Sequence, residues 1–200
     1  MSILTTNGIT LLHDNSLLSP SLCDDIRNYI DTQEQLEKLE STSIQQYSNV
    51  QCVEKQVYKK DPFYHEITEV FLRLQTFIKS FLNLKVMGDS GYKLRKIHST
   101  TRLHSDGTTD DTYVRILSCI IALNSDYGGG EITFPRQDFK AVMEKGDIIL
   151  FPPYWTHPHM VYPPHRGTNR YTINTWLYDG SLMEATWKPK KNKNSNHNIY

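Results

Sequence analysis

Apolar residues recur at helical spacing in two segments of the N-terminal half. The first helix is predicted to begin at Ser19 and Pro20, because serine is a preferred N-cap residue and proline is favoured at the first helical position. The second is predicted to follow Asp61 and Pro62. Its apolar stripe comprises Ile67, Val70, Phe71, Leu74, Phe77, Ile78 and Phe81. Residues 32–50, rich in Gln, Glu, Ser and Thr, fit either an extension of the first helix or a mobile loop.

From about residue 85 the pattern changes to short runs of β-branched and aromatic residues separated by turn signals. The predicted strands cover residues 92–97, 112–123, 131–134, 139–142, 147–151, 160–162 and 170–178. No helical pattern interrupts them, which favours an antiparallel sandwich or barrel. We therefore expect one mostly β domain over residues 1–187, an α+β arrangement with N-terminal helices to about residue 84 and a β core over about 85–187. Residues 188–200 are polar and basic and are expected to form a disordered tail.

Composition and charge exclude several classes of protein. A length of 200 residues suits one domain, and 22 Lys and Arg balance 22 Asp and Glu, so no global basic field attracts nucleic acid or membranes. The cysteines Cys23, Cys52 and Cys119 are odd in number and widely spaced, which fits free thiols in a reducing compartment. The start of the chain lacks a basic region followed by an apolar run, and no stretch approaches the roughly 20 apolar residues of a membrane span. We expect a soluble, cytoplasmic protein.

Histidine and carboxylate side chains concentrate in two segments. His104 and Asp106 are two residues apart and would share a face on an extended strand, and His157 and His159 follow about fifty residues later. Two histidines and one carboxylate on adjoining strands would form a facial triad with three open coordination positions, which is typical of non-haem Fe(II) oxygenases. The H-x-D pair alone also fits an incidental surface or core histidine. Arg170 opens the last predicted strand and could bind a carboxylate in bidentate fashion.

Further motifs follow in order around these residues. They are Asn124 followed by Gly129-Gly130-Glu131-Ile132-Thr133-Phe134-Pro135, then Lys145-Gly146-Asp147 before Phe151-Pro152, then His159 with Val161, Pro163 and Gly167 before Arg170-Tyr171. In this order and spacing, the sequence resembles the 2-oxoglutarate/Fe(II)-dependent dioxygenases, specifically the prolyl 4-hydroxylase-like branch. The resemblance runs from Leu17 to about Trp187. It implies a double-stranded β-helix, a jelly-roll, cupin-like barrel whose mouth holds the metal.

The resemblance also implies which residues form the catalytic metal site. His104 and Asp106 correspond to the first two iron ligands, and His159 corresponds to the third. His157 is the rival for the third position, because it would share a strand face with His159 if the segment is extended.

The co-substrate arginine is assigned by the same resemblance. Arg170 corresponds to the residue that binds the distal carboxylate of 2-oxoglutarate. One extra residue separates it from Gly167 compared with the usual family spacing, and Arg166 is the alternative.

Four more residues are candidates for the pocket. The family has a second co-substrate contact, a tyrosine upstream of H-x-D, and here Tyr92 and His98 are the residues nearest to that position. Trp176 is expected to line the barrel near the co-substrate, with plain core packing as the alternative. Arg115 resembles a family position near the mouth, where it would contact substrate or form a structural ion pair.

The resemblance implies Fe(II), 2-oxoglutarate and O2, with ascorbate as an optional reductant, and hydroxylation of an unactivated C–H bond. The branch points to a prolyl residue in a peptide or protein; a free amino acid or other small molecule is the alternative. Nucleic-acid dioxygenases carry a second arginine six residues after the first, whereas Trp176 holds that position after Arg170, so no nucleic-acid partner is expected. A cupin-like metal-binding or structural jelly roll is the alternative outside enzymes. The oligomeric state is left open.

Overall fold

The computed structural model describes residues 1–37, 52–107, 114–167 and 169–179. The expected tail at 188–200 and most of the segment 32–50 lie outside these residues. The helices are α1 (Pro20–Glu37) and α2 (Tyr64–Phe77), which continues into the π-helical turn η1 (Ile78–Leu82). The strands are β1 (Ser2–Thr6), β2 (Ile9–His13), β3 (Cys52–Val57), β4 (Gly88–Asp89), β5 (Tyr92–Ile97), β6 (Thr101–His104), β7 (Val114–Ala122), β8 (Tyr127–Gly129), β9 (Ile132–Phe134), β10 (Phe139–Ala141), β11 (Asp147–Phe151), β12 (His159–Val161), β13 (Pro164–Gly167) and β14 (Arg170–Asp179).

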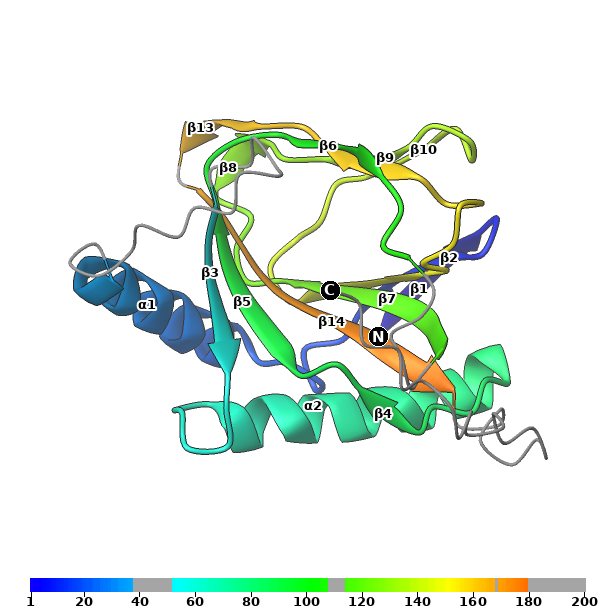
Figure 1. The fold of residues 1–200 in the computed structure, drawn as a ribbon, viewed down its shortest axis with the longest axis horizontal. Helices are drawn as coiled ribbons and strands as arrows, with labels where there is room; N and C mark the ends of the chain where they lie inside the picture. Colours follow the sequence, from blue (N-terminus) through cyan, green and yellow to red (C-terminus); the bar gives the residue numbers. More distant parts are fainter. Residues whose placement is uncertain (38–51, 108–113, 168, 180–200) are drawn as a thin grey trace, which may run out of the picture.

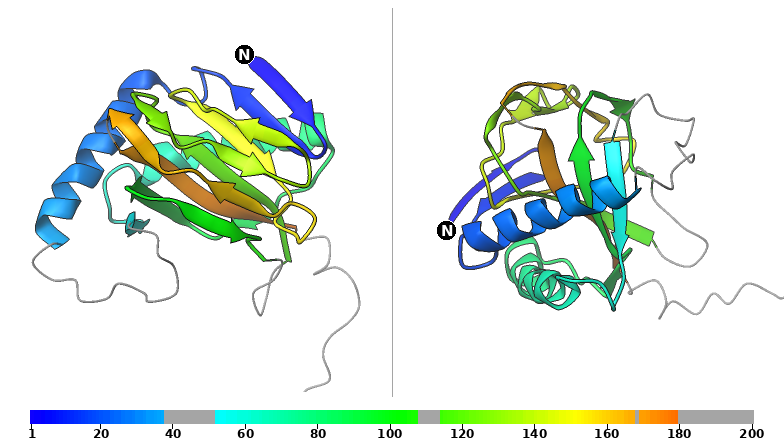
Figure 2. Two further views of the ribbon diagram at one scale, coloured as in Figure 1. Left: turned by 90° about the horizontal axis from the view of Figure 1, so that it is seen from above. Right: turned by 90° about the vertical axis from the view of Figure 1, so that its left-hand side faces the viewer.

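Two antiparallel sheets face each other, and the helices cover the outer face of the larger one (Figure 1, Figure 2). The larger sheet has the order β1-β2-β11-β7-β14-β5-β3, with β4 added against β14. The smaller sheet has the order β10-β9-β12-β6, and β13 pairs with β8 beside it. This arrangement is the double-stranded β-helix that the order of sequence motifs implies.

The strands of the larger sheet have two buried faces, and side chains alternate between them. On β7, Ile121 packs in the cluster beneath the helices, whereas Ile120 packs in the cluster between the two sheets. On β14, Tyr171 and Ile173 likewise belong to the helix-side cluster. Arg170, Asn174 and Trp176, at the intervening positions, therefore face the space between the sheets, where a site can form.

The helix boundaries follow the sequence signals closely. Helix α1 begins at Pro20, and the hydroxyl of Ser19 accepts a hydrogen bond of 3.2 Å from the backbone N–H of Leu22, as an N-cap serine should. Helix α2 begins two residues after Pro62, behind Phe63, whose left-handed φ of 66° turns the chain into the helix. Neither helix combines the length and hydropathy that a membrane-spanning segment needs.

The first 84 residues also contribute three strands, and the expectation of helices alone in this part is wrong. Strands β1 and β2 form a hairpin whose turn residues Asn7 and Gly8 have φ values of 47° and 82°, as the Asn-Gly hairpin turn requires. Strand β2 pairs with β11, and β3 pairs with β5 at the other end of the sheet. An alternating pattern does not mark these strands, because apolar residues are adjacent in both of them, at Ile3-Leu4 and at Leu11-Leu12.

Replacing Phe71 by Ala is expected to destabilise the protein by about 3–5 kcal/mol, because the buried ring leaves a cavity and loses its neighbours. Phe71 is 1% exposed, and its ring stacks on that of Tyr92 with centroids 4.9 Å apart. The adjacent Leu72 is 56% exposed and provides the matched control, with an expected change within about 0.5 kcal/mol. Urea unfolding of both variants checks this, and similar losses in the two would contradict the packing described.

Candidate metal and co-substrate site

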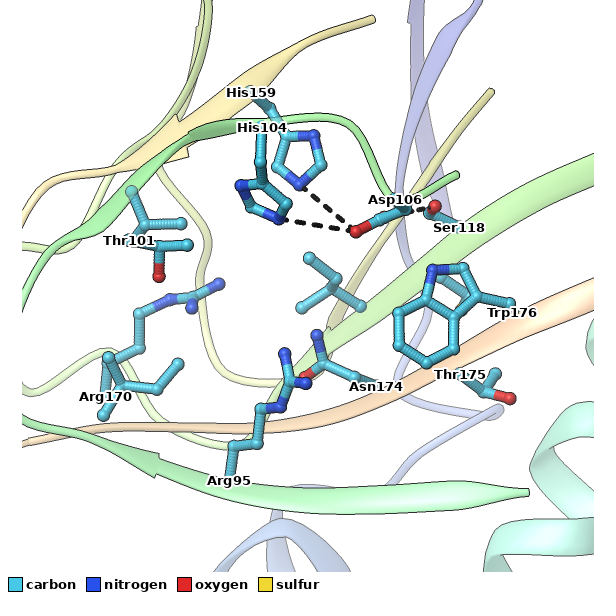
Figure 3. A pocket seen from close by; sticks show the side chains of 14 residues that line it. Arg95, Thr101, His104, Asp106, Ser118, His159, Arg170, Asn174, Thr175 and Trp176 are labelled. Carbon is cyan, nitrogen blue, oxygen red and sulfur yellow. Dashed lines mark hydrogen bonds and ion pairs between the residues drawn. The ribbon is translucent and has the colours of Figure 1, made fainter. Parts of the chain in front are cut away.

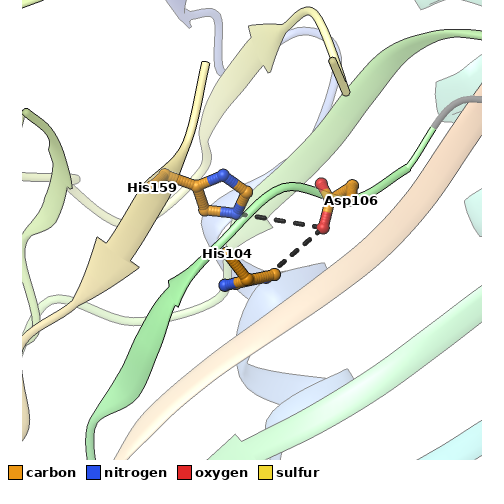
Figure 4. A group of neighbouring side chains, drawn as sticks. All are labelled: His104, Asp106 and His159. Carbon is orange, nitrogen blue, oxygen red and sulfur yellow. Dashed lines mark ion pairs between the residues drawn. The ribbon is translucent and has the colours of Figure 1, made fainter. Parts of the chain in front are cut away.

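His104, Asp106 and His159 come together where the smaller sheet faces β7 and β14 (Figure 4). Strands β6 and β12 are paired so that His104 lies directly opposite His159, and the chain turns after β6 to place Asp106 beside both. Oδ1 of Asp106 lies 3.5 Å from Nε2 of His104 and 3.9 Å from Nε2 of His159. One ligand atom from each residue lies within 4.8 Å of the others, and this is the one such His/Asp group found among the described residues.

The two imidazole rings are oriented by backbone carbonyl groups. Nδ1 of His104 lies 2.8 Å from the carbonyl oxygen of Arg102, and Nδ1 of His159 lies 3.3 Å from that of His157. In this arrangement Nδ1–H donates to the carbonyl, so each Nε2 keeps its lone pair and faces the centre of the group.

Asp106 is held by two side chains from β7. The hydroxyl of Ser118 donates a hydrogen bond of 2.5 Å to Oδ2, and Nη1 of Arg115 donates one of 2.7 Å to the Asp106 backbone carbonyl. Oδ1 therefore remains directed at the two histidines. Arg115 acts here on the position of Asp106 through a backbone carbonyl rather than through the ion pair that the sequence suggested.

The charges within the group suit metal binding. Burial alone would raise the pKa of the Asp106 carboxyl. When the rings are protonated, His104 hydrogen-bonds to this carboxylate and His159 adds a positive charge; together with the hydrogen bond from Ser118 these outweigh burial and leave the Asp106 pKa well below its usual value. Burial lowers the pKa of His159, so its ring is neutral near pH 7. An ionised carboxylate beside a neutral imidazole offers lone pairs to a cation.

The donor set fits Fe(II). Two imidazole nitrogens and one carboxylate oxygen, all on one side of a common centre, form the facial arrangement of non-haem iron oxygenases, which leaves three coordination positions for ligands. A structural zinc site would instead need a fourth protein ligand to close a tetrahedron.

His157 is directed away from this group. Its Nε2 lies 2.8 Å from the backbone carbonyl of Asn7, and its Nδ1 lies 2.9 Å from the hydroxyl of Thr156. Strand β12 begins only at His159, so the two histidines do not share a strand face as the sequence suggested. His157 instead links the segment before β12 to the turn of the N-terminal hairpin through its hydrogen bond with Asn7.

A pocket extends from the metal group along the inner face of β14 (Figure 3). Arg170 is 2% exposed and lines this pocket, and its guanidinium points into it. Burial raises the pKa of the Tyr127 phenol, and the nearby charge of Arg170 offsets part of this rise. Trp176 lies on the same face of β14 and lines the other end of the pocket. A buried cation in a pocket wall favours an anionic ligand.

Three other candidates lie outside the pocket lining. Tyr92 is 3% exposed in the helix-side core, where it stacks on Phe71 and hydrogen-bonds to Thr68, so the expected co-substrate contact is not supported. His98 follows β5, and its Nδ1 lies 3.0 Å from Oδ1 of Asn169. Arg166 is exposed on β13. Tyr92, His98 and Arg166 therefore do not line the pocket that contains Arg170.

Several pocket residues were not predicted. Ser118 and Asn174 lie on the inner faces of β7 and β14, and Arg95 lies on the inner face of β5. The alternation that contains Arg170 and Trp176 would have identified Asn174. No motif marks Ser118 or Arg95, because their roles depend on pairings between distant strands.

Comparison with known proteins agrees with this geometry. Residues 92–178 match the family model described as the 2OG-Fe(II) oxygenase superfamily. The matched segment contains every residue of the metal group and Arg170. This stretch of the chain, which holds the metal group and Arg170, carries the domain of 2-oxoglutarate-dependent oxygenases. No curated protein matches the chain in sequence.

Solved structures share the fold. The viral collagen prolyl hydroxylase vCPH of Paramecium Bursaria Chlorella virus-1, in complex with 2OG, has a TM-score of 0.66 at 17% identity, covering 86% of this chain and 96% of that one. A Pseudomonas putida prolyl-4-hydroxylase has a TM-score of 0.63 at 16% identity, covering 86% and 92%. A Trichoplax adhaerens prolyl hydroxylase, in complex with a peptide fragment of the hypoxia inducible factor oxygen degradation domain, has a TM-score of 0.66 at 16% identity, covering 92% and 89%. These similarities establish the architecture.

Replacing His159 by Ala is expected to abolish tight binding of Fe(II) or Co(II), because it removes one of three ligands. The matched change His157→Ala should leave metal affinity within a few-fold and instead lower thermal stability, because it frees the turn at Asn7. Anaerobic titration calorimetry with each metal, beside thermal unfolding, measures both effects. Loss of metal binding in the His157 variant alone would reverse the assignment.

Proposed function

We propose that this protein is an Fe(II)- and 2-oxoglutarate-dependent hydroxylase that acts on a prolyl residue of a peptide or protein. One observation carries the proposal: a two-histidine, one-carboxylate group and the buried Arg170 guanidinium line one pocket. The group fits a metal with open positions, and the guanidinium fits the far end of a dicarboxylate. A co-substrate with a 2-oxo acid at one end and a carboxylate at the other matches both features.

His104, Asp106 and His159 would hold the iron. When bound, the iron supplies the redox chemistry that couples conversion of 2-oxoglutarate and O2 to succinate and CO2 with hydroxylation of a C–H bond. Ser118 fixes the carboxylate rotamer of Asp106, which keeps one oxygen aimed between the two histidines. The protein thereby sets the positions of the ligands before substrate arrives.

Arg170 would bind the distal carboxylate of 2-oxoglutarate. Its side chain is enclosed by the sheet, so a salt bridge formed there is screened little by water. A fixed guanidinium presents paired N–H donors that match a carboxylate, so it sets the direction of the co-substrate as well as its affinity. The opposite end of the co-substrate is then directed at the metal group across the pocket (Figure 3).

The prolyl substrate is supported by the sequence motifs of the prolyl 4-hydroxylase-like branch and by a shared fold. One of the similar structures is a prolyl hydroxylase in complex with a peptide. The smaller sheet carries His104 at 40% side-chain exposure, so the metal group opens to the surface and is accessible to a chain segment. A free amino acid could reach the same opening, and the substrate experiment below separates the two.

Replacing Arg170 by Gln is expected to weaken 2-oxoglutarate binding by roughly 100-fold or more while Fe(II) binding persists, because a buried charged hydrogen bond is lost. Arg166→Gln is the matched control, because this arginine is exposed on β13. The affinity of this variant for 2-oxoglutarate should be unchanged. The weak visible charge-transfer band of anaerobic Fe(II) and 2-oxoglutarate measures the dissociation constant. A larger loss in the Arg166 variant would reassign the co-substrate contact.

Proline-containing peptides are expected to raise succinate release above the rate without substrate and to gain one oxygen atom. Mass spectrometry of the peptide and quantification of succinate check the coupling of the two. His104→Ala should abolish both signals. Turnover of free proline or another small molecule, with none of any peptide, would replace the peptide proposal by the small-molecule alternative.

A further inference from the structure

Basic side chains gather around the indole of Trp176, at the less buried end of the pocket. The guanidinium carbon of Arg115 lies 4.3 Å from the centroid of the Trp176 ring, and Nζ of Lys93 lies 5.6 Å from it. Arg95 lies two residues from Lys93 on the same face of β5 and lines the pocket. In Figure 3 its guanidinium points from β5 past Asn174 toward the metal group.

The strand register separates Arg95 from the co-substrate arginine. On β14, Arg170 pairs with Ile97, whereas Thr172 pairs with Arg95. Two residues of strand span about 7 Å, so Arg95 arises one step nearer to Trp176 than Arg170 does. The two guanidinium groups therefore serve different parts of the pocket.

Among the described residues, the cluster around Arg95 keeps a positive charge. Glu54 on β3 accepts hydrogen bonds of 2.7 Å from both Arg95 and Lys93. Burial raises the pKa of Glu54, but the neighbouring charges of Arg95 and Lys93 outweigh it and leave the pKa below its usual value. One carboxylate thus faces two cations.

Neither Fe(II) nor 2-oxoglutarate would need the positive charge of Arg95 and Lys93 as a partner. With both bound, the two charges of Fe(II) and the one of Arg170 would be balanced by Asp106 and the two carboxylates of 2-oxoglutarate. The excess at Arg95 and Lys93 is then available to a third ligand, which is the substrate. In a chain with zero net charge, such a local excess beside a site is a feature of the site itself.

We propose that Arg95, supported by Lys93, selects a substrate that carries a carboxylate close to the carbon to be hydroxylated. The inference rests on the proposed function and narrows its substrate class. The carboxylate could come from an acidic side chain next to a prolyl residue or from the α-carboxylate of a free amino acid, because a guanidinium binds both in the same way. A nucleic acid fits less well, because its phosphates need an extended basic track whereas these cations surround one indole.

Calorimetry on the anaerobic protein loaded with Fe(II) and 2-oxoglutarate tests this preference. The probes are end-blocked pentapeptides with a central proline followed by Glu, Gln or Lys, and the pair L-proline and L-prolinamide. A 12-nucleotide single strand tests the nucleic-acid alternative. The variants are Arg95→Gln and, as matched control, Lys55→Gln, which removes the same charge from β3 on the helix side, where Lys55 lies over the ring of Tyr29.

We expect at least one carboxylate probe, the Glu peptide or free proline, to bind roughly tenfold more tightly than its neutral counterpart, and the Lys peptide to bind most weakly. The probe pair that shows the difference identifies the source of the carboxylate. Arg95→Gln should erase the difference and Lys55→Gln should keep it. Equal binding of all probes, equal effects of the two substitutions, or tighter binding of the oligonucleotide would overturn the proposal.

Two control measurements distinguish a failure of the Arg95 proposal from a failure of the proposed function. The charge-transfer band with Fe(II) and 2-oxoglutarate is recorded first, and its absence from the unmodified protein would overturn the proposed function instead. A tenfold weaker 2-oxoglutarate affinity in Arg95→Gln would assign Arg95 to the co-substrate and overturn substrate selection. If thermal unfolding shows that Arg95→Gln does not fold, Lys93→Gln replaces it, with a smaller loss of carboxylate preference expected and no loss contradicting the proposal.

Discussion

The pairing of β6 with β12 is the constraint on which the rest of the site depends. It places His104 opposite His159, and the turn after β6 then carries Asp106 to the same point. A shift of one residue in this register would turn one histidine to the other face of the sheet and separate the imidazoles. Ser118 and Arg115 on the facing sheet fix Asp106, so the group also depends on how the two sheets pack together.

The larger sheet serves two environments at once because its side chains alternate. Residues such as Ile121 and Ile173 hold the helices, while Arg170 and Trp176 on intervening positions form the pocket wall. The apolar contacts beneath the helices can therefore supply stability without entering the site. On the inner face, a second apolar cluster around Ile120 and Phe134 adjoins the pocket, and the polar and charged groups are confined to the pocket lining.

Local signals predicted much of this structure, and distant pairings account for what they missed. The N-cap at Ser19 and most of the strands after residue 85 needed only neighbouring residues and are found where expected. The expected extended strand through the H-x-D motif ends at His104, and Asp106 follows it. Tyr92 was misplaced because alternation along β5 does not show which face meets the helices. Ser118, Arg95 and the contact of His157 with Asn7 depend on strands that lie far apart in the chain.

The N-terminal hairpin has a consequence for how the chain assembles. Strand β2 is hydrogen-bonded to β11, and His13 meets Asp147 across a sequence separation of 134 residues. During synthesis β2 must wait, without its partner, until β11 has also left the ribosome. Such long-range closure slows folding, and the two exposed strands of the hairpin are open to wrong pairing during that interval.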